Sequence, residues 1–112
     1  MRHSVRVLAR AEADADDIYL WLLKRSPAGA WAWYGALKRC LEQVGDSADS
    51  YSLAPETVKV GMDLRQAFFK TPHGRNYRLL FVIVDEEVRV LRVRGPGQKL
   101  ISRRDLPDEG VS

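Results

Sequence analysis

The sequence predicts a single α+β domain of order β-α-α-β-β-β, in which a helical hairpin packs on one face of a mainly antiparallel four-stranded sheet. Apolar residues recur at helical spacing in the first half of the chain, and from about residue 62 they form short strand-like runs. The 112 residues fit one domain spanning 1–112. A hydrophobic fraction of 46% predicts a packed core and excludes a disordered chain.

The first strand and the first helix are predicted within residues 4–25. Residues 4–8 are short, β-branched and alternating, which is typical of a strand with Val5 and Val7 facing inward. Residues 12–25 are predicted to form a helix, with acidic residues at its start and basic residues at its end, as suits the helix dipole. Its apolar face carries Ala11, Ala15, Ile18 and Leu22.

A second helix is predicted from Ser26 to about Val44. Ser26 is a capping residue and the proline after it suits a first helical turn. Gly45 is predicted to end this helix. The short joint predicts an antiparallel hairpin, and the polar stretch 46–61 is predicted to be a loop. The apolar stripe of the second helix is Ala30, Trp33, Leu37, Leu41 and Val44.

Three strands are predicted in the second half, at residues 64–70, 77–84 and 88–94. Turn-forming residues occupy 71–74, and a Gly-Pro-Gly sequence at 95–97 ends the last strand. We expect the tail from about residue 102 to be flexible.

Side-chain pairing favours a three-residue turn between the last two strands. A two-residue turn of Asp85 and Glu86 would place Leu79 opposite Arg92 and bring a charge beside the core. The three-residue register instead pairs Val84 with Val88, Leu80 with Arg92, and Arg78 with Arg94. Its apolar face carries Leu79, Phe81, Leu91 and Val93. Its other face, away from the helices, groups Arg78, Arg92 and Arg94.

Positive charge is concentrated in one segment of the chain. Residues 58–104 carry +7, whereas residues 1–57 carry −1 and residues 105–112 carry −3. Such a segment attracts phosphates or an acidic partner, and the alternative is a solubilising surface. The candidate residues of a basic binding face are Arg65, Arg75, Arg78, Arg92, Arg94, Lys99 and Arg103.

Several residue types exclude other classes of site. The lone cysteine, Cys40, excludes an internal disulfide and suits a reducing compartment, so we expect a cytoplasmic protein. No apolar run is long enough for a membrane span, and no spacing suits a metal, a phosphate loop or a cofactor. Trp31 and Tyr34 point away from the apolar stripe, so they are candidate partner contacts.

Five stretches resemble the RelE/ParE superfamily of toxins, and within it the ParE-like plasmid stabilisation proteins. They are VRVLARAEAD at 5–14, RSPAGA at 25–30, LRQ at 64–66, YRLLF at 77–81, and VLRVRG at 90–95 followed by Gln98. Their order and spacing span about residues 5–101. The resemblance implies a growth-inhibiting toxin of a type II toxin-antitoxin system. It also implies a cognate antitoxin that forms an oligomer with the toxin and wraps it.

The resemblance offers two targets. RelE-type members cleave mRNA in the ribosome, whereas ParE-type members act on DNA gyrase without nuclease chemistry. Arg78 occupies the position of a phosphate-contacting arginine in RelE-type nucleases, and Lys70 lies near their lysine-bearing strand. Arg94, Lys99 and Arg103 add charge.

An RNA-cleaving site also needs a general acid and a general base, which arginine does not supply near neutral pH. No Tyr, His or Trp follows Tyr77, and Tyr77 itself is predicted to face the core. His73, in a predicted turn, is the one titrating candidate near the basic face. Whether the chain is an enzyme therefore stays open, with Arg78, Lys70 and His73 as candidate catalytic residues.

Three hypotheses follow from these residues. The leading one is a ParE-like toxin that binds its target without catalysing a reaction. The second is a ribosome-dependent mRNA endonuclease. The third is a degenerate, non-toxic, basic nucleic-acid-binding domain.

Overall fold

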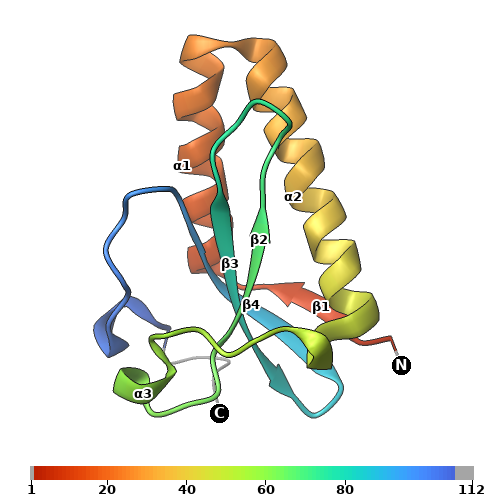
Figure 1. The fold of residues 1–112 in the computed structure, drawn as a ribbon, viewed down its shortest axis with the longest axis vertical. Coiled ribbons are helices and arrows are strands. Elements are labelled where there is room, and N and C mark those ends of the chain that lie inside the picture. The colour runs from red at the N-terminus through yellow and green to blue at the C-terminus, as the bar shows by residue number, and fades with distance from the viewer. Residues whose placement is uncertain (1, 108–112) are drawn as a thin grey trace.

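Two long helices stand side by side on one face of a four-stranded sheet in this computed structural model, which describes residues 2–107 (Figure 1). The helices are α1 (Ala9–Arg25) and α2 (Pro27–Ser47). The strands are β1 (Ser4–Val7), β2 (Arg65–Phe69), β3 (Tyr77–Val84) and β4 (Glu87–Arg94). The sheet order is β1-β4-β3-β2, with β1 parallel to β4 and the other pairs antiparallel. The predicted α+β order is confirmed.

The hairpin joint is capped as the sequence predicts, because the Ser26 hydroxyl oxygen accepts a hydrogen bond from the Gly29 N–H at 3.0 Å. The predicted end of the second helix at Gly45 was wrong, since α2 continues to Ser47. A Cβ at Gly45 would lie 3.0 Å from Cγ2 of Val5. The glycine therefore serves the close approach of α2 to β1, where the N–H of His3 donates to the Gly45 carbonyl at 2.7 Å.

The main core lies between the helical hairpin and the sheet. Of the predicted stripe of α2, Trp33, Leu37 and Val44 are buried in this core and Leu41 is partly buried against it. Leu79, Phe81 and Val93 meet them from the sheet and are buried. Val5, Val7, Ile18 and Leu22 are partly buried and pack against this core, on the faces that their spacing predicts.

The predicted turn between β3 and β4 was wrong, although part of its register is correct. Asp85 and Glu86 form a two-residue turn, so Val84 lies opposite Glu87. An irregularity between Leu80 and Phe81 then shifts the register by one residue, because β4 carries a β-bulge there. Beyond the bulge the predicted pairs Leu80–Arg92 and Arg78–Arg94 are present. Leu91, which was predicted to share the core face of Leu79 and Phe81, packs on the opposite face instead.

That opposite face carries a second core, so it is not the open basic surface that the charge pattern predicted. The stretch 46–61 was predicted to be a loop but contains a 3-10 helix, Ala48–Ser50, and a short helix α3, Thr57–Val60. This connection and the segment after β4 lie over the sheet on the side away from α1 and α2 (Figure 1). The side chains of this second core are Leu8, Ala54, Val60, Leu64, Leu80, Val82, Leu91, Ile101 and Leu106.

The end of the chain is described as far as Pro107. A 3-10 helix, Arg103–Asp105, begins with a capping box between Ser102 and Asp105. The tail that we expect to be flexible from about residue 102 extends beyond this point, and its residues 108–112 lie outside the described residues. Within residues 2–107, no helix combines the length and the apolar character that crossing a membrane requires.

Candidate functional site

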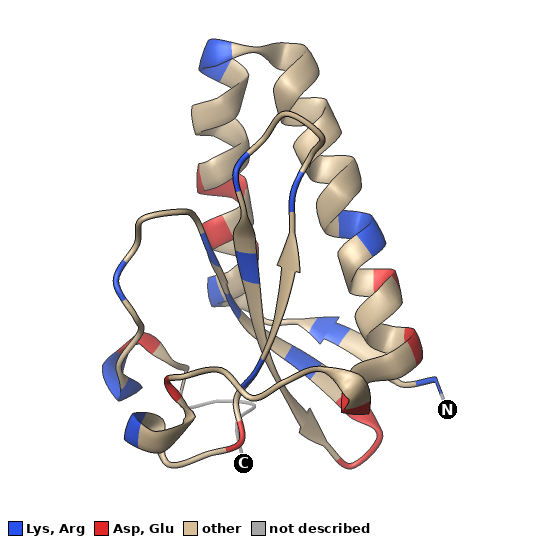
Figure 2. Cartoon of the chain, viewed as in Figure 1, with Lys and Arg blue, Asp and Glu red and all other residues tan. Residues whose placement is uncertain are grey.

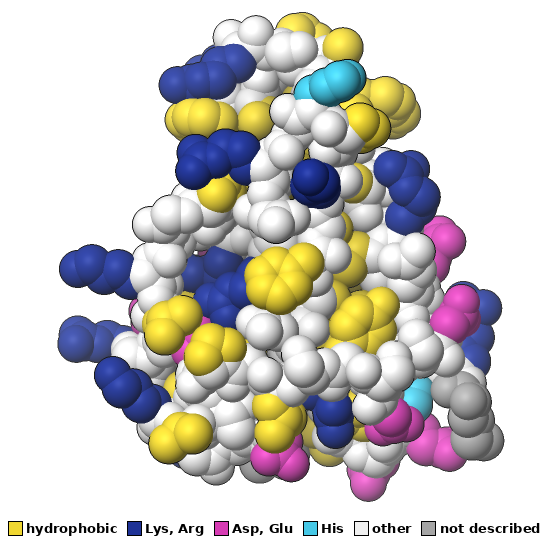
Figure 3. Space-filling model, in the orientation of Figure 1, with side chains coloured by type: hydrophobic (Ala, Val, Ile, Leu, Met, Phe, Trp, Pro, Cys, Tyr) yellow, Lys and Arg dark blue, Asp and Glu magenta, His cyan; other side chains and the backbone are white. Residues whose placement is uncertain are grey.

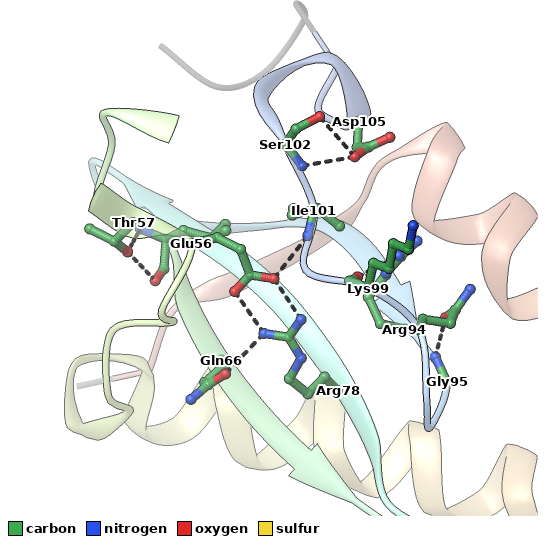
Figure 4. Close-up of polar contacts among 12 residues, drawn as sticks. Glu56, Thr57, Gln66, Arg78, Arg94, Gly95, Lys99, Ile101, Ser102 and Asp105 are labelled. Atoms are coloured by element: carbon green, nitrogen blue, oxygen red, sulfur yellow. Dashed lines mark hydrogen bonds and ion pairs between the residues drawn. The ribbon is translucent and has the colours of Figure 1, made fainter. Parts of the chain in front are cut away.

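Arg78 is held by a buried carboxylate on the face of the sheet that carries the second core. Its Nη1 and Nη2 donate to Oε1 and Oε2 of Glu56 at 2.8 and 2.6 Å, and Nη1 also donates to Oε1 of Gln66 at 3.1 Å (Figure 4). Glu56 is 1% exposed and accepts a third bond from the Ile101 N–H at 3.2 Å. The Arg78 guanidinium therefore forms a bidentate pair that faces into the protein.

The hydrogen bonds to Glu56 also keep its carboxylate ionised. Burial by itself raises the pKa of Glu56, but the hydrogen bonds from Arg78 and from the Ile101 N–H hold that pKa below its usual range. The carboxylate is therefore ionised near neutral pH, and its charge balances that of Arg78.

Arg92 is paired in the same way with the first helix. Its Nε and Nη2 donate to the two carboxylate oxygens of Asp14 at 2.7 and 3.0 Å, and Nη1 donates to the Asp105 carbonyl at 2.9 Å. Arg92 is 5% exposed. Its charge is therefore neutralised inside the protein, between α1, β4 and the C-terminal segment.

Arg94 is the third arginine that was predicted to lie on this face. It is on β4, directly opposite Arg78 on β3. Burial and the neighbouring Arg92 charge lower the pKa of Arg94. Its Nη2 donates to the Lys99 carbonyl at 2.8 Å. The three arginines thus lie together, but their hydrogen bonds are directed to the protein's own carboxylates and carbonyls.

The other candidates of the basic face divide into two kinds. Arg65 donates to the Tyr51 carbonyl at 2.5 Å and Arg103 to the Val60 carbonyl at 2.6 Å, so both hold the connection between α2 and β2. Arg75 and Lys99 are exposed and make no ion pair with another described residue. Lys and Arg lie along β3, β4 and the segment after β4, whereas acidic residues mark the β3–β4 turn (Figure 2). On the face drawn in Figure 3, basic side chains gather on the left and acidic ones at the lower right.

The three catalytic candidates do not share one surface. Lys70 is exposed just beyond β2. His73 lines a hollow with Trp33 and Tyr77 on the helix side of the sheet, whereas Arg78 binds Glu56 on the other side. Tyr77 packs its ring against Trp33 and Phe69, with centroids 5.5 and 5.8 Å away.

Among the described residues, neither Cys40 nor a group of metal-ligating side chains adds a further reactive site. Burial raises the pKa of Cys40 to about 11, so its thiol is protonated and suits packing. Among residues 2–107, no three His, Cys, Asp or Glu side chains are grouped so that they would hold a metal ion.

The predicted partner contacts lie on the outer face of the helical hairpin. Trp31 is 69% exposed and stacks on Tyr34 with ring centroids 6.2 Å apart. Both rings line a hollow of about 270 Å³ together with Ala15, Asp16 and Tyr19.

A second aromatic surface was missed by the sequence analysis. Trp21 is 52% exposed, and the guanidinium carbon of Arg25 lies 3.6 Å above its ring. Two hollows, of about 430 and 300 Å³, share Trp21, Arg75 and Tyr77 in their linings. We call their union the Trp21 groove, formed by Trp21, Arg25, His73, Arg75, Tyr77 and Pro96. The sequence could have indicated this surface, because Trp21 lies off the apolar stripe of its helix, as Trp31 does on the other helix.

Comparison with known proteins identifies the family. No curated protein matches the chain. The family model described as the ParE toxin of type II toxin-antitoxin system, parDE, matches residues 5–99, which include both long helices, the strands β2 to β4 and all of β1 except Ser4. The chain therefore belongs to the ParE toxin family of type II toxin-antitoxin systems.

Proposed function

We propose that this toxin acts by binding a target protein such as DNA gyrase, and that it catalyses no reaction itself. The observation that carries the proposal is the bidentate pair between Arg78 and Glu56, whose carboxylate oxygens lie 2.8 and 2.6 Å from the guanidinium. A nuclease would need this arginine free to contact a phosphate whose negative charge grows in the transition state. In this structure both Nη atoms of Arg78 instead donate to the charged carboxylate of Glu56.

Proton transfer supports the same proposal. RNA cleavage without a metal needs a base and an acid within hydrogen-bond reach of the reacting oxygens. His73 lines a hollow on the helix side of the sheet, and Tyr77 is packed between Trp33 and Phe69. Neither lies on the side of the sheet where Arg78 meets Glu56.

Membership of the family implies an antitoxin partner. We infer that this antitoxin forms an oligomer with the toxin, and that growth inhibition appears only when the toxin is released. DNA gyrase and the alternative target, ribosome-bound mRNA, both lie in the cytoplasm, so we place the pair there.

The decisive experiment uses purified wild-type chain in two assays. We expect it to inhibit DNA supercoiling by gyrase, and we expect the antitoxin to relieve that inhibition. Added to translating ribosomes, the same preparation should leave mRNA intact. Codon-positioned cuts would overturn the proposal and establish the endonuclease. Binding to nucleic acid without growth arrest on induced expression would instead establish a non-toxic basic domain.

A further inference from the structure

We propose that the outer face of the helical hairpin binds a second copy of this chain, about a two-fold axis that runs parallel to the helices. In this dimer α1 of each copy packs against α2 of the other, so that four helices form a bundle. The pairing needs neither the antitoxin nor the target, so it goes beyond the proposed function.

The outer face of the hairpin carries a cluster of large apolar side chains that the protein leaves in water. On α1, Leu20 is 55% and Leu23 is 37% exposed, and both share a helical stripe with Tyr19. On α2, the exposed rings of Trp31 and Tyr34 are three residues apart and form the facing stripe. We call these five side chains the outer patch. Single exposed apolar residues are ordinary, whereas a contiguous group of them marks an interaction site.

The two stripes of the outer patch meet along a hollow. Tyr19 contacts Tyr34 edge to face, with ring centroids 6.0 Å apart, and Trp31 stacks on the other side of the contact at 6.2 Å from Tyr34. Ala15 and Asp16 complete the lining of the hollow, whose volume is about 270 Å³. The outer face therefore has two ridges with a depression between them, and a second pair of helices fills such a surface by packing its ridges into the grooves.

Two opposite charges border the outer patch at the same level of the hairpin. Asp16 comes three residues before Tyr19 on α1, and Lys38 comes four residues after Tyr34 on α2. Because the helices are antiparallel and rise 1.5 Å per residue, both charges lie about 5 Å from the Tyr19–Tyr34 contact in the same direction. The contacts agree with this, since Asp16 lines the hollow and Nζ of Lys38 lies 5.6 Å from the centroid of the Tyr34 ring.

This arrangement of charges selects the direction of the two-fold axis. An axis parallel to the helices places α1 on α2 of the second copy and keeps the level of each residue. Asp16 then faces Lys38 of the second copy, and the symmetry repeats this contact. An axis across the helices would place α1 on α1 and α2 on α2, so no contact between Asp16 and Lys38 could form.

The same axis also matches the apolar side chains. It brings Leu23 against Trp31 of the second copy and Tyr19 against Tyr34 of the second copy, which removes the exposed rings from water. Tryptophan and tyrosine are the residues most enriched among those that dominate binding energy at protein interfaces.

A second copy suits the outer patch better than a partner whose charge has one sign. An acidic peptide or a nucleic acid would approach Asp16 with like charge, and a basic segment would do the same at Lys38. A second copy instead pairs both charges at once. The outer patch is therefore complementary to itself.

The first test measures self-association of the full wild-type chain by sedimentation equilibrium over a range of concentrations. Trp31→Ala should raise the dissociation constant of the dimer by at least about 30-fold, as truncation of a central aromatic anchor does. The matched control is Trp21→Ala, which removes an exposed tryptophan of α1 outside the hollow. It should stay within about twofold of the wild type, because substitutions outside an interface are close to neutral.

The second test uses charge reversal to establish the axis. Asp16→Lys and Lys38→Asp should each weaken self-association about tenfold, because like charges then face each other at both symmetric contacts. An equimolar mixture of the two variants should associate about as tightly as the wild type, because unlike charges meet at both contacts of the mixed dimer. Native mass spectrometry identifies that mixed dimer by its mass.

Two measurements control the charge variants. Asp17→Lys makes the same change at the next position, outside the hollow, and should leave the dissociation constant within about twofold of the wild type. Circular dichroism checks that each variant is folded.

Four outcomes would overturn the proposal. A wild-type chain that stays monomeric up to about 100 μM would exclude the dimer. Self-association that Trp21→Ala abolishes and Trp31→Ala does not would place the interface elsewhere. Charge variants that fail to associate when mixed would exclude this two-fold axis. A monomeric wild-type chain whose binding to the antitoxin or to gyrase falls in Trp31→Ala would assign the outer patch to that partner. The toxin assays are separate measurements, so none of these results changes the outcome for the proposed function.

Discussion

Asp14 on α1 and Arg92 on β4 join the first helix to the edge of the sheet beyond the end of β1. The Asp14 carboxylate accepts both bonds of the bidentate pair and, through Oδ2, a third from the N–H of Val93 at 3.0 Å. β1 pairs with β4 only as far as Val90. A side chain of the helix thus satisfies a backbone donor of β4 that the shorter neighbouring strand does not reach.

Asp14→Ala should therefore destabilise the fold strongly. It leaves the Arg92 guanidinium, 5% exposed, without its carboxylate, and breaking a buried pair in this way costs about 3–5 kcal/mol. Urea unfolding measures the change. Asp16→Ala on the exposed side of the same helix is the control and should change the free energy of unfolding by about 0.5 kcal/mol or less. Equal effects of the two substitutions would show that the pair contributes nothing.

The ion pair of Glu56 predicts a specific dependence of stability on pH. Because the pKa of Glu56 is lower in the folded protein than in the unfolded chain, its contribution is present above the unfolded value of about 4.3. It is lost as the pH falls through the lower folded pKa. Glu56→Gln should be less stable than the wild type at neutral pH, because it replaces the carboxylate that pairs with Arg78. As the pH falls below about 4.3, the difference between the two proteins should shrink.

Unfolding curves at a series of pH values check this, with the exposed Glu42→Gln as the control. The control should follow the wild-type curve throughout. A constant difference between the wild type and Glu56→Gln at every pH would contradict the assignment.

Phe81→Ala tests the main core. The Phe81 side chain is fully buried between the sheet and the helices, so its truncation should cost about 3–5 kcal/mol. Phe68→Ala makes the same chemical change on the neighbouring strand, where 58% of the side chain is exposed, and should cost about 0.5 kcal/mol or less. Denaturant unfolding distinguishes the two, and similar losses would mean that β3 is packed differently.

Asp85→Val tests the two-residue turn that replaced the predicted one. Asp85 has φ of 58°, a left-handed conformation that aspartate and glycine tolerate and that a β-branched residue does not. The valine variant should lose about 1–2 kcal/mol, the cost of the left-handed conformation, whereas Asp85→Gly should be at least as stable as the wild type. Thermal unfolding of both variants decides, and equal stability would place the turn elsewhere.

The sequence determined the two long helices, the four strands and most of the main core, because these depend on periodicity and on local chemistry. Leu37 and Val44 recur on one face of α2, and Ser26 caps its first turn. The alternation in β3 likewise placed Leu79 and Phe81 on the core face. The order and spacing of the same stretches were also sufficient to indicate the toxin family that the family model matches.

The tertiary structure alone decided the role of the arginines. Arg92 and Asp14 are 78 positions apart, and Arg78 and Glu56 are 22 apart, so no local pattern predicts that they meet. The net charge of a sequence segment counts every arginine as a free positive charge. In the folded protein, a buried carboxylate within hydrogen-bond distance neutralises the charge of Arg78 and of Arg92. The bulge that turns Leu91 to the second core is equally invisible to alternation, which assumes an unbroken ladder. The Trp21 groove likewise exists only where α1 meets the two turns beside it, because a concave surface needs walls from segments that are distant in sequence.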